Sequence, residues 1–296
     1  MTKPLVSIVT RTKDREILLR RAIADCVNQT YENFELIIVN DGGAFEPVDA
    51  LLKEFSSRLA GRAQVIHNQE SQGMERASNQ GVERSAGKYV CIHDDDDTWA
   101  PSFLKTCVGY LEANPEQGGV AVRTQIVLEK ISGDEVTEIG RRLAWPDIHQ
   151  FSLSKLMFSN IAVPISCMYP RKVIEDLGGF RDDLPVVGDW EFHLRLALKY
   201  DVGFIDGKPL AFWHQRRASR GIMGNSVFAG ADKHEYFDLQ VRDEYLRDYA
   251  ENNGIGALLW QSAMFNHLNG SSETAFSWSK RKVREFLMNR RQGKAK

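Results

Sequence analysis

Two hydrophobic patterns alternate over the first hundred residues. Short runs of branched aliphatic residues, such as Leu36–Val39, end at polar or glycine-rich residues, which is typical of buried parallel strands. Between these runs, apolar residues recur at three- to four-residue spacing, as in Ile17–Cys26, where Asp14 is the expected N-cap. The pattern predicts the order β-α-β-α-β-α-β and ends in a strand at Tyr89–Ile92.

Polar residues follow the predicted strands. A chain of alternating strands and helices forms right-handed crossovers and a mainly parallel sheet covered by helices on both faces. Ligands of such α/β sheets bind beyond the carboxyl ends of the strands. The residues at these ends are Thr10–Thr12, Asp41–Gly43 and Asp94–Asp97. We therefore expect these three segments to meet at one rim of the sheet.

The pattern changes after residue 118. Two β-rich segments between residues 119 and 139 flank Ser132-Gly133-Asp134, which indicates a hairpin. The remaining pattern predicts helices at residues 151–158, 171–177 and 189–199, an extended segment at 166–169, and a nearly continuous helical region from residue 221 onward.

Composition and charge exclude several classes of protein. Hydrophobic residues make up 43% and charged residues 26%, which is close to the average soluble globular chain. The 38 Lys and Arg residues are balanced by 40 Asp and Glu residues, so no overall basic field favours nucleic acid as a partner. The four cysteines lack the spacing of a disulfide framework or a zinc site. No apolar run is long enough for a signal sequence or a membrane span, and we expect a cytoplasmic protein.

The acidic run Asp94–Asp97 is the sharpest chemical feature of the sequence. Adjacent carboxylates repel one another and raise some of their pKa values unless a cation is present. A hard divalent ion such as Mg²⁺ uses one or two carboxylates together with substrate phosphates. In an extended segment Asp94 and Asp96 would share one side. The alternative is a solvated acidic turn, but the position after a hydrophobic strand favours a ligand site.

Asp41 is a second candidate for ligand binding. An acid at the end of the second strand of a nucleotide-binding half contacts a ribose or a base. Asp41 could equally be a turn residue before Gly42. Together with the acidic run, Asp41 points to a nucleoside diphosphate as the ligand.

Seven motifs occur in the order found in family 2 glycosyltransferases, and the chain resembles that family over residues 4 to about 220. They are Val6–Arg11, Val39–Gly43, Gly73–Gly81, Ala86–Tyr89, Asp94–Asp97, Gly178–Phe180 and Asp189–Glu191. The resemblance implies a GT-A domain over residues 1–220, with a Rossmann-like nucleotide-sugar half (1–100), an acceptor half (101–220) and a mainly parallel central sheet. A helical C-terminal extension would follow over residues 221–296.

The resemblance also implies an activity. Members of this family transfer a sugar from a nucleotide-sugar donor, here expected to be a UDP-sugar, with inversion at the anomeric carbon. The acceptor would be a glycan or a lipid-linked molecule, as in the synthesis of bacterial surface polysaccharides. The cofactor would be Mn²⁺ or Mg²⁺, held at the Asp-x-Asp motif.

Residue roles on the donor side follow from the same resemblance. Thr10, Arg11 and Asp41 would hold the nucleoside. Asp94 would lie near the ribose and the metal, and Asp96 would be the principal metal ligand.

Residue roles on the acceptor side are implied in the same way. Asp189 takes the place of the family's catalytic base, and Glu191 is the reserve candidate. His214 resembles a histidine that approaches the diphosphate or the metal. Asp189 could alternatively be a helix N-cap, and His214 could be a hydrogen-bonded histidine of a strand.

The sequence departs from the family pattern at two positions. Ser78 stands where the family usually has an arginine, and Arg76 is the expected substitute for contact with the nucleotide. Gly188 stands where a glutamate usually precedes the base Asp189.

Two further functions are compatible with the same motifs. The spacing Asp94-x-Asp96-x-Thr98 also resembles the nucleophile motif of aspartyl-phosphate phosphohydrolases. A glycan-binding pseudo-transferase without activity would fit the departures at Ser78 and Gly188.

The end of the chain is strongly basic. Residues 280–296 contain eight Lys or Arg residues and one acidic residue, Glu285. On a helix, Val283, Phe286 and Leu287 can share a face opposite basic residues, as in helices that bind anionic membrane surfaces. A solvated terminal helix explains the pattern equally well.

Overall fold

The computed structural model describes residues 5–133, 135–216, 221–225 and 231–265. The chain divides into two compact units, Met1–Asp238 and Leu239–Lys296. The division lies within helix α10 (Ala231–Asn253). The domain boundary expected between residues 220 and 221 stays a prediction.

The first half of the larger unit has the alternation that the sequence predicts. Its elements are β1 (Val6–Thr12), α1 (Glu16–Val27), β2 (Phe34–Asp41), α2 (Phe45–Glu54), α3 (Ser56–Leu59), β3 (Ala63–Asn68), α4 (Met74–Arg84) and β4 (Tyr89–Asp94). All seven residues of β1 are buried, as expected for a strand that is covered on both faces.

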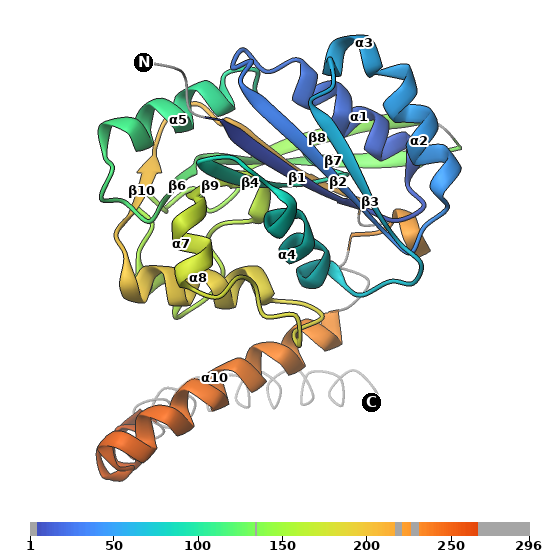
Figure 1. Ribbon diagram of the computed structural model, residues 1–296. Helices are drawn as coiled ribbons and strands as arrows, with labels where there is room; N and C mark the ends of the chain where they lie inside the picture. Colours follow the sequence, from blue (N-terminus) through green and yellow to red (C-terminus); the bar gives the residue numbers. More distant parts are fainter. Residues whose placement is uncertain (1–4, 134, 217–220, 226–230, 266–296) are drawn as a thin grey trace, which may run out of the picture. The chain divides into compact units, whose positions relative to one another are not determined.

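These strands form the larger of two sheets. Its seven strands lie in the order β10 (Val202–Ile205), β6 (Gly119–Val122), β9 (Cys167–Pro170), β4, β1, β2 and β3. β9 runs antiparallel to both of its neighbours, and all other pairs are parallel. The mainly parallel α/β sheet expected from the sequence is confirmed (Figure 1).

The second sheet contains the predicted hairpin. Its strands lie in the order β5 (Thr98–Trp99), β11 (Ala211–Gln215), β7 (Thr124–Ser132) and β8 (Glu135–Leu143). β7 and β8 pair antiparallel around Gly133, with a register shift at Leu128 and Glu129. Such a bulge re-aims side chains near functional sites.

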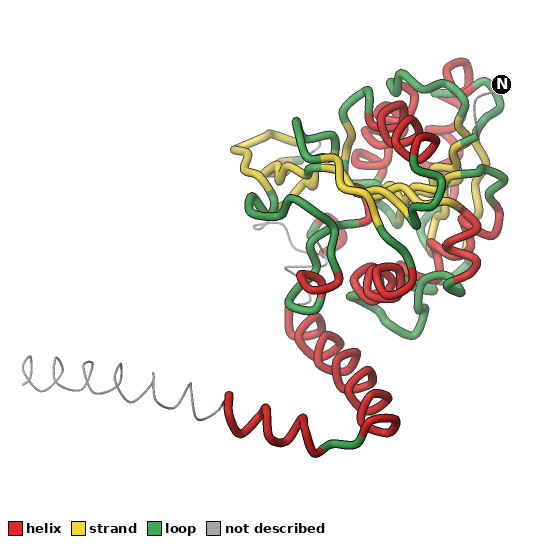
Figure 2. Tube along the Cα trace, turned by 90° about the vertical axis from the view of Figure 1, so that its left-hand side faces the viewer, coloured by secondary structure: helices red, strands yellow, loops and turns green. Residues whose placement is uncertain are grey.

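Helices cover both faces of the larger sheet (Figures 1 and 2). α1, α2 and α5 (Phe103–Ala113) lie on one face, and α4, α7 (Arg171–Asp176) and α8 (Gly188–Lys199) lie on the other. The short helix α6 (Leu153–Leu156) and the 3₁₀ turns η1 (Pro164–Ser166) and η2 (Gly221–Met223) complete the described elements.

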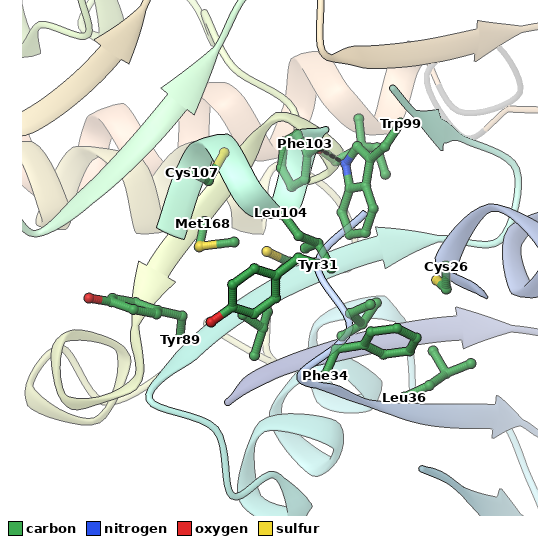
Figure 3. Packing of buried hydrophobic residues seen from close by; sticks show 14 of the residues in the cluster. Cys26, Tyr31, Phe34, Leu36, Tyr89, Trp99, Phe103, Leu104, Cys107 and Met168 are labelled. Carbon is green, nitrogen blue, oxygen red and sulfur yellow. Dashed lines mark hydrogen bonds between the residues drawn. The ribbon is translucent and has the colours of Figure 1, made fainter. Parts of the chain in front are cut away.

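The main hydrophobic core fixes the end of the acidic run. Trp99, which is 3% exposed, stacks on Phe103 with ring centroids 4.3 Å apart (Figure 3). Its indole Nε1 donates a hydrogen bond of 2.6 Å to the Ile165 carbonyl, and its backbone N–H donates one to Asp25. A buried tryptophan with a satisfied N–H is a strong anchor. The core therefore holds the residues that immediately precede Trp99 in a fixed position.

Local differences from the predictions have physical reasons. α1 begins at Glu16 after Arg15, so the prediction that Asp14 caps this helix is wrong. Asp14 has a φ of 52°, and its carboxylate accepts a hydrogen bond from the Ala44 N–H instead. The helix expected at residues 151–158 forms only at Leu153–Leu156.

The structure also bears on three features of the composition. The four cysteines are free and buried, and burial raises the thiol pKa of Cys91 and Cys107 well above the usual range. Within the described ranges, no helix combines the length and the hydropathy that crossing a bilayer demands. The basic segment 280–296 lies outside the described residues.

Candidate active site

The carboxyl ends of β1 and β4 meet as predicted. Arg11 of β1 is paired in register with Asp94 of β4. The Arg11 Nε donates to the Asp94 carboxylate at 3.0 Å, and a second guanidinium nitrogen forms an ion pair with the same oxygen. Burial opposes the charge of Arg11, but Asp94 and Glu75 outweigh it and raise the pKa of Arg11.

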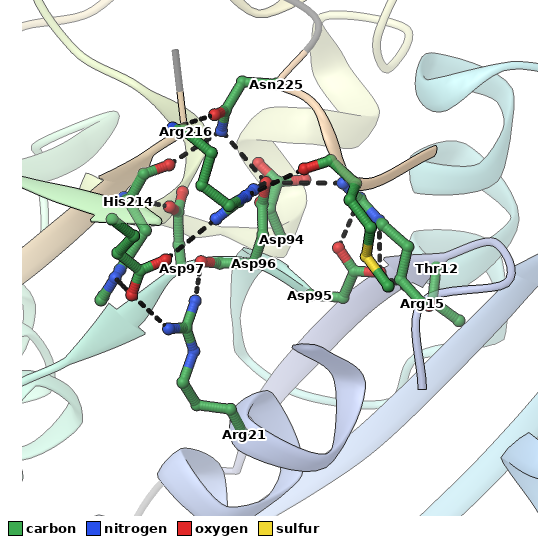
Figure 4. Close-up of polar contacts among 12 residues, drawn as sticks. Thr12, Arg15, Arg21, Asp94, Asp95, Asp96, Asp97, His214, Arg216 and Asn225 are labelled. Carbon is green, nitrogen blue, oxygen red and sulfur yellow. Dashed lines mark hydrogen bonds and ion pairs between the residues drawn. The ribbon is translucent and has the colours of Figure 1, made fainter. Parts of the chain in front are cut away.

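The acidic run is a turn rather than an extended segment. The Asp97 N–H donates to the Asp94 carbonyl at 3.2 Å, so the expected alternation of sides does not hold. Asp95 is fully buried and accepts hydrogen bonds from Thr12 at 2.7 Å and Arg15 at 3.0 Å. Burial raises the pKa of Asp95 to about 6. The turn therefore directs the carboxylates to different partners (Figure 4).

Asp96 lies at the centre of a cationic cluster. Its Oδ2 accepts hydrogen bonds from Arg216, Asn225 and Arg15, of which the Asn225 bond is 3.2 Å long. The side chain of Arg216 is fully buried and also donates to Glu129 at 3.1 Å. Burial alone would raise the pKa of Asp96, but Arg15 and Arg216 outweigh it and lower that pKa.

The two carboxylates of the Asp-x-Asp motif each keep one oxygen open. Arg15, Arg216 and Asn225 contact only Oδ2 of the Asp96 carboxylate, and Arg11 contacts only Oδ1 of the Asp94 carboxylate, so the other two carboxylate oxygens have no partner among the described residues. No cluster of three or more potential metal-binding side chains exists in the described part of the chain. Mg²⁺ commonly takes only one or two carboxylates and completes its shell with phosphates and water. The residues present therefore fit such an ion.

His214 is hydrogen-bonded at both ring nitrogens. Nδ1 lies 2.5 Å from Glu129 Oε1, and Nε2 lies 2.8 Å from the Thr98 hydroxyl. Burial lowers the pKa of His214 despite the attraction of Glu129, so the ring is neutral at pH 7. No ring nitrogen is directed at a metal in this arrangement, and the role of His214 as a metal ligand stays a prediction.

Glu129 links His214 to the arginines. It lies at the bulge of β7, is 6% exposed and forms ion pairs with Arg21 and Arg216. Burial would raise its pKa, but hydrogen bonding to His214 and the charge of Arg21 hold the pKa of Glu129 at about 2. Because His214 is neutral, the arginines balance the charge of Glu129.

Asp189 lies in the first turn of α8, after Gly188 at the start of the helix. It is therefore not the N-cap, and that alternative is wrong. Asn160 donates a hydrogen bond of 2.8 Å to Asp189 Oδ2. The Ala162 N–H donates to Asn160 Oδ1, which orients the amide so that its NH₂ group faces Asp189. Burial raises the pKa of Asp189, although Asn160 and Arg11 oppose the shift.

The backbone before Asp189 is strained. Val187 has a φ of 61°, in the left-handed region that a β-branched residue rarely adopts. Such a conformation costs on the order of 1–3 kcal/mol and persists where the surrounding structure enforces it, often at functional sites. The strain at Val187 lowers the stability of the fold, and it fixes where the first residues of α8 lie.

The reserve base Glu191 is committed to another partner. It is 2% exposed, and Arg195 donates hydrogen bonds to both of its carboxylate oxygens, the shortest at 2.7 Å. Arg195 also donates to the carbonyl of Gly179. Glu191 therefore joins α8 to the preceding glycine turn and is poorly placed to accept a substrate proton.

Asp41 and Thr10 are not directed at open space. Asp41 accepts hydrogen bonds from Ser71, Asn68 and the backbone N–H groups of Gln72 and Gly73. Burial opposes its charge, but these donors outweigh burial and lower the pKa of Asp41. Thr10 is 1% exposed, and its hydroxyl has no partner among the described residues. The roles of both in nucleoside binding stay predictions.

Arg76 does not join the other candidates. It forms an exposed ion pair with Asp182 at 3.0 Å and lines a pocket of about 470 Å³ between α4 and α7. Arg11 instead reaches Ser78, to which it donates a hydrogen bond of 3.2 Å. The guanidinium beside residue 78 therefore comes from β1, and not from Arg76 as the sequence suggested.

Several residues of the site carry no recognisable signal in the sequence. They are Arg15, Arg21, Glu75, Glu129, Asn160 and Asn225. Arg216 is the exception, because it lies two residues after the candidate His214.

Comparison with known proteins identifies the family. The family model described as Glycosyl transferase family 2 matches residues 7–178. An uncharacterized glycosyltransferase of Haemophilus influenzae is 30% identical over 193 residues, which cover 64% of this chain and 59% of that protein. The uncharacterized glycosyltransferase YwdF of Bacillus subtilis is 27% identical over 260 residues, which cover 86% of this chain and 85% of the relative.

Solved structures share the fold. S. aureus TarS 1–349 in complex with UDP-GlcNAc superimposes with a TM-score of 0.60 and 15% identity, over 84% of this chain and 74% of TarS. The mannosyltransferase PcManGT from Pyrobaculum calidifontis, in complex with GDP-Man and Mn²⁺, gives a TM-score of 0.55 and 16% identity, over 90% of this chain and 81% of PcManGT. The α/β fold is of the GT-A type, and because the family model spans more than half of the sequence, the chain belongs to glycosyl transferase family 2.

Proposed function

We propose that this protein is a metal-dependent, inverting glycosyltransferase that moves a sugar from a nucleoside-diphosphate sugar to a hydroxyl group. A UDP-sugar is the expected donor, and a glycan or lipid-linked molecule is the expected acceptor. The expected setting is the synthesis of bacterial surface polysaccharide. The two solved neighbours support the donor class, since each is a complex with a nucleotide sugar, UDP-GlcNAc for TarS 1–349 and GDP-Man for PcManGT.

One observation carries the proposal. The half-buried Asp189 lies close enough to Arg11 and Asp94 for their charges to affect its pKa, although these residues are far apart in sequence. An oriented carboxylate beside the rim that receives the donor is the arrangement that general-base catalysis needs.

On the acceptor side, Asp189 takes the proton of the attacking hydroxyl group. The acceptor oxygen forms a bond to the anomeric carbon while the bond from that carbon to the diphosphate breaks, and its electron pair leaves with the diphosphate. Burial raises the pKa of Asp189 and so makes it a stronger base. Asn160 holds the carboxylate through a 2.8 Å hydrogen bond.

On the donor side, the guanidinium group of Arg11 provides a fixed positive charge beside the leaving diphosphate. Arg11 is 9% exposed and is held in place by Asp94, Ser78 and the Met74 carbonyl. Charges that are already oriented before the reaction stabilise developing negative charge without reorganisation. Arg11 therefore both places Asp94 and favours departure of the diphosphate.

Asp96, and Asp94 beside it, would hold the divalent ion through their open oxygens. A bound Mn²⁺ or Mg²⁺ supplies Lewis-acid stabilisation of the departing diphosphate. The pairing of Asp96 with Arg15 and Arg216 keeps this carboxylate ionised.

The two alternative functions fare differently. The phosphohydrolase alternative loses its basis, because the motif Asp94-x-Asp96-x-Thr98 begins at the end of β4, the fourth strand, and the chain belongs to glycosyl transferase family 2. The glycan-binding pseudo-transferase predicts binding of a nucleotide sugar without turnover, which the screen below measures.

A screen of nucleotide sugars tests the proposal. The full chain is melted with UDP-, GDP- and dTDP-sugars, each with Mn²⁺, with Mg²⁺ or with chelator. We expect one nucleotide class to raise Tm when the metal is present, since a ligand at about 100 times its Kd adds roughly 2.7 kcal/mol to stability. Release of the nucleoside diphosphate is measured in parallel, unheated samples, with water or an added sugar alcohol as the acceptor. Binding without turnover would support the pseudo-transferase, and no Tm shift with any donor would contradict the proposal.

The variant Asp96→Asn tests the metal site. Loss of one carboxylate charge is expected to abolish the difference in donor affinity between Mn²⁺ and chelator in calorimetric titration. The matched control Asp147→Asn changes an exposed loop residue and should keep that difference. An Asp96→Asn protein with wild-type, metal-dependent affinity would show that Asp96 is not the ligand.

A further inference from the structure

The space beside the backbone of Gly188 is filled by the side chain of Glu75. A Cβ atom at position 188 would lie 2.6 Å from Glu75 Cγ and Cδ and 2.8 Å from Oε1, so a side chain there would require the flexible end of Glu75 to move. Gly188 does not have a positive φ, so the backbone conformation does not require glycine there. The Glu75 carboxyl group can therefore take its present place only because position 188 has no side chain.

Glu75 is an unusual buried carboxyl group. It lies in the first turn of α4, is 4% exposed and accepts no hydrogen bond from the described residues. Among the described residues, Glu75 forms one ion pair, with Arg11 at 3.8 Å. A buried carboxyl group without hydrogen-bond donors lowers stability. A residue that lowers stability and sits beside a catalytic group is expected to serve that group.

The surroundings of Glu75 connect it with the base. Asp189 directly follows Gly188, and the charges of Asp189 and Glu75 both act on Arg11. The charges that act most strongly on the Glu75 carboxyl group are those of Arg11 from β1, Asp94 from β4, and Asp189 and Glu191 from α8.

We propose that Glu75 is a positioning residue for Asp189: the carboxyl group of Glu75 enters from α4 into the space left by Gly188 and fixes the start of α8. This inference rests on the proposed role of Asp189. The carboxyl group beside the start of α8 thus comes from a different helix, α4, and not from position 188 itself.

Because Glu75 is protonated at pH 7, it can fill the space beside Gly188 without competing with Asp94 for Arg11. Burial and the nearby charges of Asp189 and Asp94 raise the pKa of Glu75 to about 8, against the attraction of Arg11. At pH 7 the neutral carboxyl group fills the space and leaves Arg11 paired with Asp94. Above pH 8 the ionised group competes with Asp94 for Arg11 and adds negative charge where the diphosphate leaves.

The test moves the carboxyl group back to position 188. The full chain is compared as wild type, Glu75→Ala, Glu75→Gln and the double variant Glu75→Ala/Gly188→Glu, with kcat and KM measured from pH 6 to 9.5. We expect Glu75→Ala to lower kcat about 10- to 100-fold with little change in donor KM, because the base is misplaced and the donor contacts remain. The double variant should recover at least half of that loss on a logarithmic scale.

The pH profile separates this role from a purely structural one. Wild type should lose activity above pH 8, whereas Glu75→Gln, which cannot ionise, should be more active than Glu75→Ala and lack this alkaline loss. The control Glu83→Gln alters an exposed acid of the same helix and should behave as wild type.

Two results would overturn the inference. One is a Glu75→Ala protein with the kcat of Glu83→Gln. The other is a double variant no more active than Glu75→Ala together with a wild-type alkaline limb in Glu75→Gln. If Asp189→Asn is inactive in the same assay, either result rejects only the role of Glu75. An active Asp189→Asn protein, or no turnover with any donor, rejects the proposed function as well.

Discussion

Replacing Asp189 with Asn is expected to lower kcat by about 10²- to 10⁴-fold, the usual contribution of a general base. The amide has nearly the same shape and can still accept a hydrogen bond from Asn160, but it cannot take the proton of the acceptor hydroxyl group. Donor affinity should remain that of wild type, because the proposed donor site lies at the ends of β1 and β4.

The measurement combines turnover with calorimetric titration of the donor. Asp201→Asn, at an exposed position after α8, is the matched control and should retain wild-type kcat. An Asp189→Asn protein with near wild-type turnover would show that the base lies elsewhere. Glu191, which Arg195 holds at both oxygens, would then have to be released to act.

Replacing Glu75 with Gln is expected to stabilise the fold at alkaline pH. Burial, helped by the charges of Asp189 and Asp94, raises the pKa of Glu75 from 4.5 to about 8. The folded state therefore holds a proton that the unfolded state releases, and stability falls as the pH rises from 4.5 through 8. At 1.36 kcal/mol per pKa unit, the loss approaches roughly 5 kcal/mol at pH 9, and Gln avoids it.

Urea unfolding at pH 5, 7 and 9 measures this effect. The free energy of unfolding of Glu75→Gln relative to wild type should grow from pH 5 to pH 9. The exposed control Glu83→Gln should show no such trend. An equal difference between Glu75→Gln and wild type at all three pH values would mean that Glu75 titrates normally in the folded protein.

The order of strands and helices could be predicted because it depends on short-range periodicity. The runs Leu36–Val39 and Tyr89–Ile92 are apolar at every position, and both form fully buried stretches of central strands. Helix ends were less predictable, because Asp14 found a tertiary partner in Ala44 that competes with capping. Local preference is a weak guide where a loop is fixed by a neighbouring element.

The position of the site could also be predicted, but its internal pairing could not. Parallel strands bring Arg11 and Asp94 to one rim whatever the side chains are. The partners of Asp96 come from residues more than a hundred positions away, such as Arg216 and Asn225. Nothing in a single sequence indicates which distant cation or amide will reach a given carboxylate.

The contact between Glu75 and Gly188 is another feature that a single sequence does not predict. In the sequence, Gly188 departs from the family pattern beside the proposed base Asp189, and a pseudo-transferase is compatible with that departure. In three dimensions a carboxyl group is present at that place, supplied by a helix more than a hundred residues earlier. Departures from a linear motif therefore weigh little until the neighbours in space are known.

The stereochemistry of the product tests the central claim most directly. If Asp189 activates the acceptor on the face opposite the departing diphosphate, an α-linked nucleotide sugar must give a β-linked product. Once the donor is known, the anomeric proton coupling of the product in ¹H NMR reports this configuration. We predict a β-linkage formed by wild type and absent with Asp189→Asn, and an α-linked product would contradict the account.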